Sequence, residues 1–482
     1  MKSKLLLLVL ASLITLGLSM CSPEPKQGKP NVVIIFIDDM GYADPSCFGN
    51  PIVKTPNIDA LAEGGLKFTN FYVNSPICSP SRVALNTGRY PIRYSIHSYI
   101  ASSDANHRRA MADFLDPTAP TLARTLQQNG YATGHFGKWH LGGGRDLGDV
   151  PHPTEYGFDK SLVSFEGIGN RVLFPNDGFC EQSAKLGRGE IIWAEKHTST
   201  SIYVDSALAF VKNAGDRPFF VNFCPNDVHD PHLPTKEAQS AYQSLTENPF
   251  EQQFFAVLVE LDRQIGRLIS ELDEMGQLEN TIIVFTSDNG PTDWPLYYQP
   301  ESYPENYKGE LYPPGSAGNF FGRKWSLYEG GIRMPFIIWW KGQIPAGKTD
   351  DQTIMAAMDL FPSLCALLQT DYPDNLDGTD KSQALLGNPI QVIEPIMWEY
   401  ASSTGGSILP GDTNLISPNL AIRESDWKLL INADSTEAKL FNLVQDPGET
   451  TNLVDEENEI ASNMAAKVLA WRRTMPVAIK TD

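Results

Sequence analysis

Short, continuous runs of apolar and β-branched residues recur along the chain, and polar residues follow them directly. Residues 32–37 and 281–286 are two such runs. A strand that is apolar at successive positions is buried on both faces, as in the sheets of α/β proteins. Ligand sites in these sheets lie at the carboxyl ends of the strands, so the polar residues after both runs are predicted to face one crevice. They are Asp38, Asp39, Asp288 and Asn289.

These four side chains offer three carboxylates and one amide oxygen. An all-oxygen set of this kind favours calcium or magnesium over zinc. Either pair alone is equally typical of an acidic helix N-cap or a turn. The recurrence of the pattern at two strand ends favours the metal site.

Two further apolar runs, at residues 131–136 and 218–223, lead into segments that contain histidine. The first continues into Lys138 and His140, and the second into His229. A single histidine after a strand is more often a hydrogen-bonded structural residue than a catalyst. Position alone leaves both interpretations open.

Helix-like segments alternate with these runs, which predicts an α/β fold with a sheet covered on both faces. The longest has apolar residues at three- and four-residue steps and Gly276 as its stop signal. The predicted helices are residues 56–64, 120–130, 202–213 and 251–276.

The last quarter of the chain has a different pattern. A helix at residues 358–368 is predicted to close the large domain. Strand-like segments at 419–431 and 439–443, with a helix at 459–471, then predict a small antiparallel sheet with one helix.

A cysteine lies at the predicted start of a helix. Ser79 is a good N-cap, Pro80 suits the first helical position, and Gly88 can end the helix. Cys78 is then expected just outside the positive helix terminus, where backbone N–H groups stabilise an anion. Arg82, one turn further on, would hold that anion. The segment therefore predicts an anion site beside a modifiable side chain.

The run Cys78-Ser79-Pro80-Ser81-Arg82, with Thr87-Gly88-Arg89 after it, resembles the signature of the formylglycine-dependent (type I) sulfatases. The resemblance covers nearly everything from about residue 30 onward. It implies an alkaline-phosphatase-like α/β fold, with a large mixed sheet flanked by helices and a smaller C-terminal subdomain of antiparallel sheet plus helix. It also implies that Cys78 is oxidised to formylglycine, whose hydrate is the nucleophile.

The same resemblance assigns roles elsewhere. Lys324 opens a Lys-x-x-x-x-Glu-Gly-Gly-x-Arg-x-Pro stretch that is similar to the family's sulfate-binding element, although a loop lysine is by default a solvated charge. The implied catalytic residues are Cys78, Arg82, Lys138, His140, His229 and Lys324. The implied metal ligands are Asp38, Asp39, Cys78, Asp288 and Asn289, and the implied ion is Ca2+ rather than Mg2+.

Composition restricts the partners. The 482-residue chain is 41% hydrophobic and 20% charged, which is typical of a globular protein, and its formal net charge is −20. A chain this acidic repels nucleic acid, so a polynucleotide partner is excluded. A sulfated polymer must be attracted by a local basic pocket, which charge screening over roughly 8 Å at physiological salt permits.

The N-terminus reads as a targeting segment. Lys2 and Lys4 precede an apolar stretch, residues 5–18, that is too short for a comfortable membrane span. Cys21 then resembles a bacterial lipoprotein junction, although Met20 departs from the small residue usual before the lipidated cysteine. A plain secretory peptide is the alternative.

The predicted domain organisation is therefore a signal peptide of lipoprotein type at 1–21, a linker at 22–29, a catalytic sulfatase domain at 30–385 and a C-terminal subdomain at 386–482. Four cysteines remain after Cys21 and Cys78, and they allow three disulfide pairings or free buried thiols. They are Cys47, Cys180, Cys224 and Cys365.

The predicted function is hydrolysis of a sulfate monoester, most readily exo-desulfation of a galactose-type or N-acetylgalactosamine-type glycan by an exported enzyme. The expected localisation is periplasmic or on the surface of a bacterium, with membrane contact only through the N-terminal lipid. The partners are a sulfated carbohydrate and a formylglycine-generating or anaerobic sulfatase-maturing enzyme. A phosphate or phosphonate monoester hydrolase, a broad arylsulfatase and a non-catalytic glycan-binding lipoprotein are the alternatives.

Substrate contacts are less well defined by the sequence. A Pro-rich loop carries six aromatic residues, which are as consistent with sugar-stacking platforms as with a loop that packs on itself. They are Trp294, Tyr297, Tyr298, Tyr303, Tyr307 and Tyr312. A second loop offers further candidates for substrate contact, for which solvated surface charge is the alternative. They are His97, His107, Arg108 and Arg109.

Overall fold

The computed structural model describes residues 28–292, 313–391, 394–401 and 408–476. Within these residues a large mixed sheet has eleven strands. In spatial order they are β10 (Lys348–Asp350), β2 (Leu66–Tyr72), β9 (Arg333–Trp339), β8 (Thr281–Ser287), β1 (Asn31–Ile37), β7 (Phe219–Cys224), β3 (Ala132–Lys138), β4 (Lys160–Ser164), β5 (Arg171–Leu173) and β6 (Ile191–Trp193), with β11 (Met355–Ala356) beside β2.

Strand β1 lies at the centre of this sheet, parallel to both β7 and β8. All seven of its residues are buried. Val32, Ile34 and Phe36 point into one hydrophobic core, and Val33, Ile35 and Ile37 point into the other. The continuous apolar run predicted from the sequence is therefore a strand with one core on each side, as a side-chain period of two requires.

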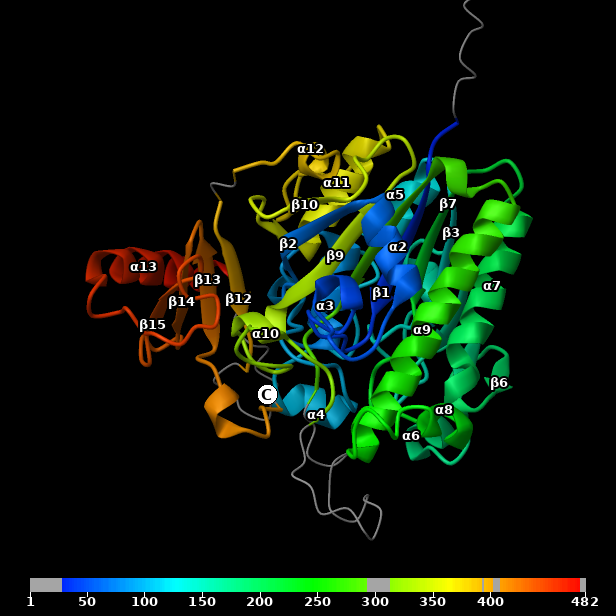
Figure 1. The fold of residues 1–482 in the computed structure, drawn as a ribbon, viewed down its shortest axis with the longest axis horizontal. Helices are drawn as coiled ribbons and strands as arrows, with labels where there is room; N and C mark the ends of the chain where they lie inside the picture. The colour runs from blue at the N-terminus through cyan, green and yellow to red at the C-terminus, as the bar shows by residue number, and fades with distance from the viewer. Residues whose placement is uncertain (1–27, 293–312, 392–393, 402–407, 477–482) are drawn as a thin grey trace, which may run out of the picture.

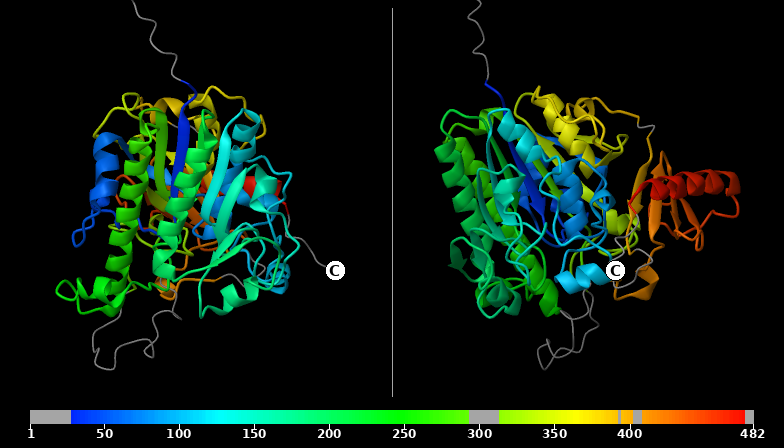
Figure 2. Two further views of the ribbon diagram at one scale, coloured as in Figure 1. Left: turned by 90° about the vertical axis from the view of Figure 1, so that its right-hand side faces the viewer. Right: turned by 180° about the vertical axis from the view of Figure 1, so that it is seen from behind.

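Helices cover both faces of the sheet (Figures 1 and 2). On one side lie α2 (Pro56–Gly64), α7 (Ser199–Ala214) and α9 (Pro249–Glu274), and on the other α3 (Cys78–Thr87), α5 (Leu122–Gln128) and α11 (Leu360–Leu367). The predicted helices match these elements within a few residues. Helix α9 buries the predicted face and is followed by Gly276, whose φ of +70° is left-handed.

The short helices lie in the connections. They are α4 (Ser103–Arg108), α6 (Gly178–Ser183), α8 (Lys236–Ser240), α10 (Glu329–Ile332) and α12 (Ser382–Leu385).

The C-terminal part forms a separate antiparallel sheet that stands beside the large one, with α13 (Asn458–Thr474) packed on it (Figure 1). The small sheet and its helix are as predicted, with two differences. The strand-like segment 419–431 is a hairpin that reverses at Ser425, which has a left-handed φ of +52°. A further strand at its edge was not predicted. The strands are β12 (Ile396–Glu399), β13 (Leu420–Glu424), β14 (Trp427–Ile431) and β15 (Lys439–Asn442).

The direction of β9 decides what reaches the site. This strand runs antiparallel to β8, so it begins at the edge where β1 and β8 end. The segment that precedes it carries Lys324 and therefore arrives at the carboxyl-end crevice. The sequence does not indicate this direction.

The five described cysteines are free thiols, so none of the possible disulfide pairings is formed. Among the described residues, every helix is too short or too polar to cross a membrane. The predicted targeting segment at 1–21 lies outside these residues.

Candidate active site

Two pairs of polar residues meet at the carboxyl ends of β1 and β8. The two strands are parallel and in register as far as Ile37 and Ser287, so the residues after them lie side by side. The Asp39 backbone N–H donates to Asp288 Oδ1 (3.1 Å), and Asn289 Nδ2 donates to Asp39 Oδ1 (2.7 Å). The structure thus brings the two predicted pairs into one crevice.

Cys78 enters the same crevice from α3. It is the first residue of the helix, with Ile77 as N-cap, whereas the sequence predicted Ser79 as N-cap and Cys78 outside the helix. The Ser79 hydroxyl instead accepts the Ile100 backbone N–H (2.9 Å). Pro80 still lies in the first turn, where its missing N–H is harmless.

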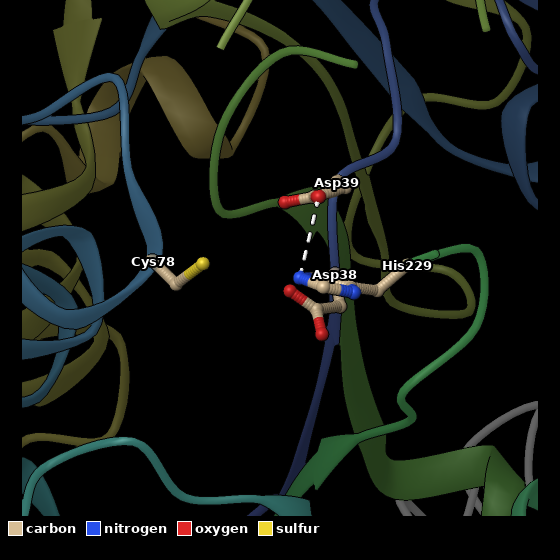
Figure 3. Close-up of side chains that lie close together, drawn as sticks. All are labelled: Asp38, Asp39, Cys78 and His229. Carbon is tan, nitrogen blue, oxygen red and sulfur yellow. Dashed lines mark ion pairs between the residues drawn. The ribbon is translucent and has the colours of Figure 1, made fainter. Parts of the chain in front are cut away.

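Four side chains cluster at this point (Figure 3). Ligand-capable atoms of Asp38, Asp39, Cys78 and His229 lie within 4.8 Å of one another. In Figure 3 the Cys78 side chain points from one wall toward the two aspartates and His229. His229 Nε2 lies 3.6 Å from Asp39 Oδ2.

Two buried lysines neutralise the aspartates. Lys324 Nζ contacts both carboxylate oxygens of Asp39 (2.6 and 2.7 Å), and Lys138 Nζ contacts Asp38 Oδ1 (2.6 Å). Burial alone would raise the pKa of Asp39, but Lys324, His229 and Lys138 together outweigh it and hold that pKa well below its usual range. The same pairing raises the pKa of Lys324 despite its burial.

The donor set fits a hard divalent cation. Asp38 Oδ2 and Asn289 Oδ1 are buried oxygens without a hydrogen-bond partner among the described residues. Orphaned buried acceptors are costly unless a ligand satisfies them. Three carboxylates and one amide oxygen suit calcium or magnesium, and the Cys78 side chain lies where a further ligand would come from.

Arg82 lies beneath the crevice. Its Nη2 is 2.7 Å from Asp288 Oδ2, and its Nη1 donates to the Lys138 carbonyl (3.0 Å). The sequence predicted that Arg82 would hold the bound anion. In this structure it pairs with Asp288, and neither it nor Lys138 is among the described residues that line the pocket.

The His140 side chain lines the pocket, and the hydrogen-bond partner of one ring nitrogen defines its tautomer. Its Nε2 lies 3.2 Å from the Ile100 carbonyl oxygen and must donate there. Nδ1 is then the unprotonated acceptor, and it has no partner among the described residues. Burial and the Lys138 charge lower the pKa of His140, so the neutral ring can accept a proton at Nδ1.

Lys196, which was not predicted as a site residue, holds the loop that carries His229 in place. Lys196 Nζ donates to the carbonyls of His229 (2.6 Å) and Pro231 (2.8 Å). His232, which had no assigned role, binds the Val228 carbonyl through Nε2 (2.8 Å) and supports the same loop. Nothing in the sequence around Lys196 distinguished it from a surface lysine.

A cavity of about 340 Å³ opens above the cluster. Of the predicted catalytic residues, Cys78, His140, His229 and Lys324 line it. The candidates of the second loop do not, and Arg109 is buried with its Nη2 on the Tyr99 hydroxyl (2.7 Å). The aromatic candidates between Trp294 and Tyr312 lie outside the described residues.

Phe165, which was not predicted as a site residue, follows β4 at the same edge of the sheet. Its ring lies 5.2 Å from Lys138 Nζ and 5.0 Å from the His140 ring. Several residues around the site have left-handed backbones that only glycine adopts without cost, which is common at functional sites. They are Asp39, His140, Phe165, Glu166 and Trp325.

Comparisons with known proteins agree with this geometry. Residues 30–370 match the sulfatase family, and residues 316–474 match the C-terminal region of N-sulphoglucosamine sulphohydrolase. Human arylsulfatase A is 33% identical over 404 residues, which cover 79% of this chain and 71% of that protein. The N-acetylgalactosamine-6-O-sulfatase of Bacteroides thetaiotaomicron is 30% identical over 495 residues, with 91% and 92% of the two chains covered.

Among solved structures, Ps i-CgsB in complex with k-i-k-neocarrahexaose superposes with a TM-score of 0.73. It is 27% identical, and the match covers 92% of each chain.

Proposed function

This chain belongs to the sulfatase family, with its alkaline-phosphatase-like fold and sulfuric ester hydrolase activity, and we propose that it removes sulfate from a terminal galactose or N-acetylgalactosamine of a sulfated glycan. The observation that carries the proposal is the cluster in which Cys78 Sγ, the carboxylates of Asp38 and Asp39, and His229 lie within 4.8 Å of one another. The pocket above it is large enough for one sugar unit, which supports exo action.

Cys78 itself is a poor nucleophile. Burial raises the pKa of its thiol to about 11, so at neutral pH it is protonated. We infer that it is oxidised by a formylglycine-generating or anaerobic sulfatase-maturing enzyme. The aldehyde hydrate at position 78 would then supply the attacking hydroxyl.

The metal ligands in this proposal are Asp38, Asp39, Asp288, Asn289 and residue 78, and the ion is Ca2+. When bound, a divalent cation would polarise the sulfate oxygens and lower the pKa of a coordinated hydroxyl. Calcium suits this site better than magnesium because a carboxylate-rich cage with several protein ligands is typical of calcium.

The remaining roles follow from position. Lys324 lines the pocket and supplies positive charge to the sulfate oxygens, with Lys138 and Arg82 reinforcing the charge from below. We infer that His229, with Lys324, protonates the leaving oxygen. His140 accepts a proton from the residue 78 hydroxyl at Nδ1, the nitrogen that its bond to Ile100 leaves unprotonated.

Export completes the proposal. A lipoprotein-type signal ending at Cys21 would place the enzyme in the periplasm or on the cell surface, where glycan fragments arrive. Fatty-acid labelling of the native protein and of a Cys21→Ala variant tests the lipid anchor.

The function is tested on protein made with a maturing enzyme. Mass spectrometry of the peptide across Cys78 should show formylglycine, and the enzyme should hydrolyse sulfated galactose or N-acetylgalactosamine far faster than the phosphate esters of the same sugars. A preference for the phosphate or phosphonate esters would overturn the proposal in favour of the main alternative. Cys78→Ala is the matched inactive control.

A further inference from the structure

One wall of the active-site pocket is formed by residues with no part in sulfate chemistry. Tyr99, Arg145, Phe165 and Phe179 line the same cavity as Cys78. We propose that Arg145 and Phe179 form the subsite that recognises the sugar carrying the sulfate: Phe179 stacks on the ring, and Arg145 donates hydrogen bonds to an oxygen substituent next to the ester. This inference rests on the proposed glycan sulfatase function.

The Arg145 guanidinium is held within an aromatic frame. Its central carbon lies 4.8 Å from the ring centroid of Phe179, 5.6 Å from that of Phe165 and 5.8 Å from that of Tyr99. These rings limit the freedom of the guanidinium and fix the plane in which its N–H groups donate. Its side chain is 18% exposed.

Glu166 fixes the other side of Arg145. Its carboxylate pairs with Arg145 Nε and is almost fully buried. Phe165 and Glu166 adopt left-handed φ values of +44° and +56°, and Gly167 packs so closely on Trp139 that a Cβ there would lie 2.9 Å from it. This strained, tightly packed turn holds the Phe165 ring and the Glu166 carboxylate against Arg145. Rigid support of this kind is typical of a preorganised binding site.

Phe179 presents an exposed ring at the mouth of the pocket. It is 55% exposed although it is a large apolar side chain. Its short helix, α6, is secured at its start by Asp177, whose side chain accepts the N–H groups of Phe179 and Cys180 (2.9 and 3.0 Å). An exposed aromatic ring on a fixed backbone is suited to stack on the apolar face of a sugar.

The charges that line the pocket indicate which kind of substrate group Arg145 binds. Among the described lining residues, Lys324 and Arg145 carry permanent positive charge, and no carboxylate is present. Phe165 contacts Lys138 on the sulfate side and Arg145 on the other. Arg145 therefore meets the substrate beyond the sulfate, where a hydroxyl, an acetamido carbonyl or a second anionic group offers acceptor oxygens.

The test measures the ratio of kcat/KM for a sulfated saccharide to kcat/KM for nitrophenyl sulfate, which lacks the sugar. Arg145→Met should lower this ratio by roughly 10- to 100-fold, because a site built to hydrogen-bond a substrate loses discrimination when its donor is removed. Arg145→Lys keeps the charge without the planar fork, so its ratio should lie between those of the original protein and Arg145→Met.

Phe179→Ala should lower the ratio mainly by raising KM for the saccharide. Arg263→Met, an exposed arginine on α9, is the matched control and should leave the ratio unchanged.

Comparing neutral monosulfated sugars with sugars that carry a carboxylate or a second sulfate identifies the acceptor group. Equal losses of both activities in Arg145→Met, or an unchanged ratio in both variants, would overturn the subsite. Thermal unfolding of each variant separates such losses from misfolding. Failure of the proposed function is a different result, because the matured enzyme without any of these substitutions would then hydrolyse none of the sulfated saccharides.

Discussion

Lys324 and Asp39 form a buried ion pair, with Nζ 2.6 and 2.7 Å from the two carboxylate oxygens. The pair joins a residue proposed for the sulfate to a residue proposed for the metal. Both side chains are nearly inaccessible to solvent, so neither charge is stable there without the other or a substitute. A divalent cation at Asp39 would release Lys324 toward the substrate.

Replacing Lys324 should therefore damage turnover. Lys324→Met is expected to lower kcat by roughly 100- to 1,000-fold, the usual effect of removing one preorganised group that stabilises transition-state charge. Steady-state kinetics on a sulfate ester measure it, with exposed Lys348→Met as control. A variant with more than about a tenth of the original kcat would contradict the assigned role.

Removing divalent cations should abolish activity but leave the protein folded, because Lys324 and Lys138 already neutralise Asp39 and Asp38. Calcium at about 100 times its Kd adds about 2.7 kcal/mol to the free energy of unfolding, so Tm should rise on its addition. Magnesium should restore less activity than calcium. Full turnover in the presence of a strong chelator would argue against a metal at this site.

Lys196 is expected to act by positioning His229. Lys196→Met removes the ammonium from the His229 and Pro231 carbonyls and should lower kcat by roughly 10- to 100-fold, since small displacements of a catalytic group are costly. The loss should be greater for sugar sulfates than for nitrophenyl sulfate, because a poor leaving group depends more on its proton donor. The same loss on both substrates would indicate a general structural role. Exposed Lys212→Met is the control.

Lys428 should matter for stability and not for chemistry. Its buried ammonium joins Glu329 (2.9 Å) on the segment before β9 to Glu449 (3.0 Å) in the C-terminal part. Lys428→Met removes the ion-pair partner of the buried Glu449 carboxylate and one of the partners of Glu329, which keeps its pair with Arg333 (3.2 Å). It should lower the free energy of unfolding by about 3–5 kcal/mol, measured by denaturant titration. Adding Glu329→Gln and Glu449→Gln should recover part of this loss. Lys467→Met, which breaks an exposed pair, should cost under about 1 kcal/mol.

Asp359 should contribute a pH dependence to stability. Burial raises the pKa of its carboxyl to about 6 in the folded state, above the model-compound value of 3.8. Between these values the folded state binds more protons than the unfolded state, so this contribution falls as pH rises from 4 to 6, by at most roughly 1.4 kcal/mol per pH unit. Asp359→Asn should remove that slope, whereas exposed Asp455→Asn should not. Parallel stability curves for Asp359→Asn and the original protein would refute the assignment.

Much of the fold was predictable because local patterns carry it. The apolar run of β1 requires burial on both faces, and the three- and four-residue spacing in α9 requires one buried face, whatever surrounds them. The polar residues that end β1 and β8 were predicted to converge because parallel neighbours end at one edge. The motif around Cys78 identified the family, although the N-cap was assigned two residues too late, at Ser79 and not at Ile77.

The sequence did not indicate which charged side chains form ion pairs with one another. Three pairings, Arg82 with Asp288, Lys138 with Asp38 and Lys324 with Asp39, join residues 100 or more positions apart. The antiparallel direction of β9 and the aromatic frame around Arg145 depend likewise on segments that meet only after folding. The sequence determined which strands, helices and reactive groups exist, because these depend on neighbours along the chain. The tertiary structure decided which charges touch and which rings line the pocket, because burial and distance in space set those energies.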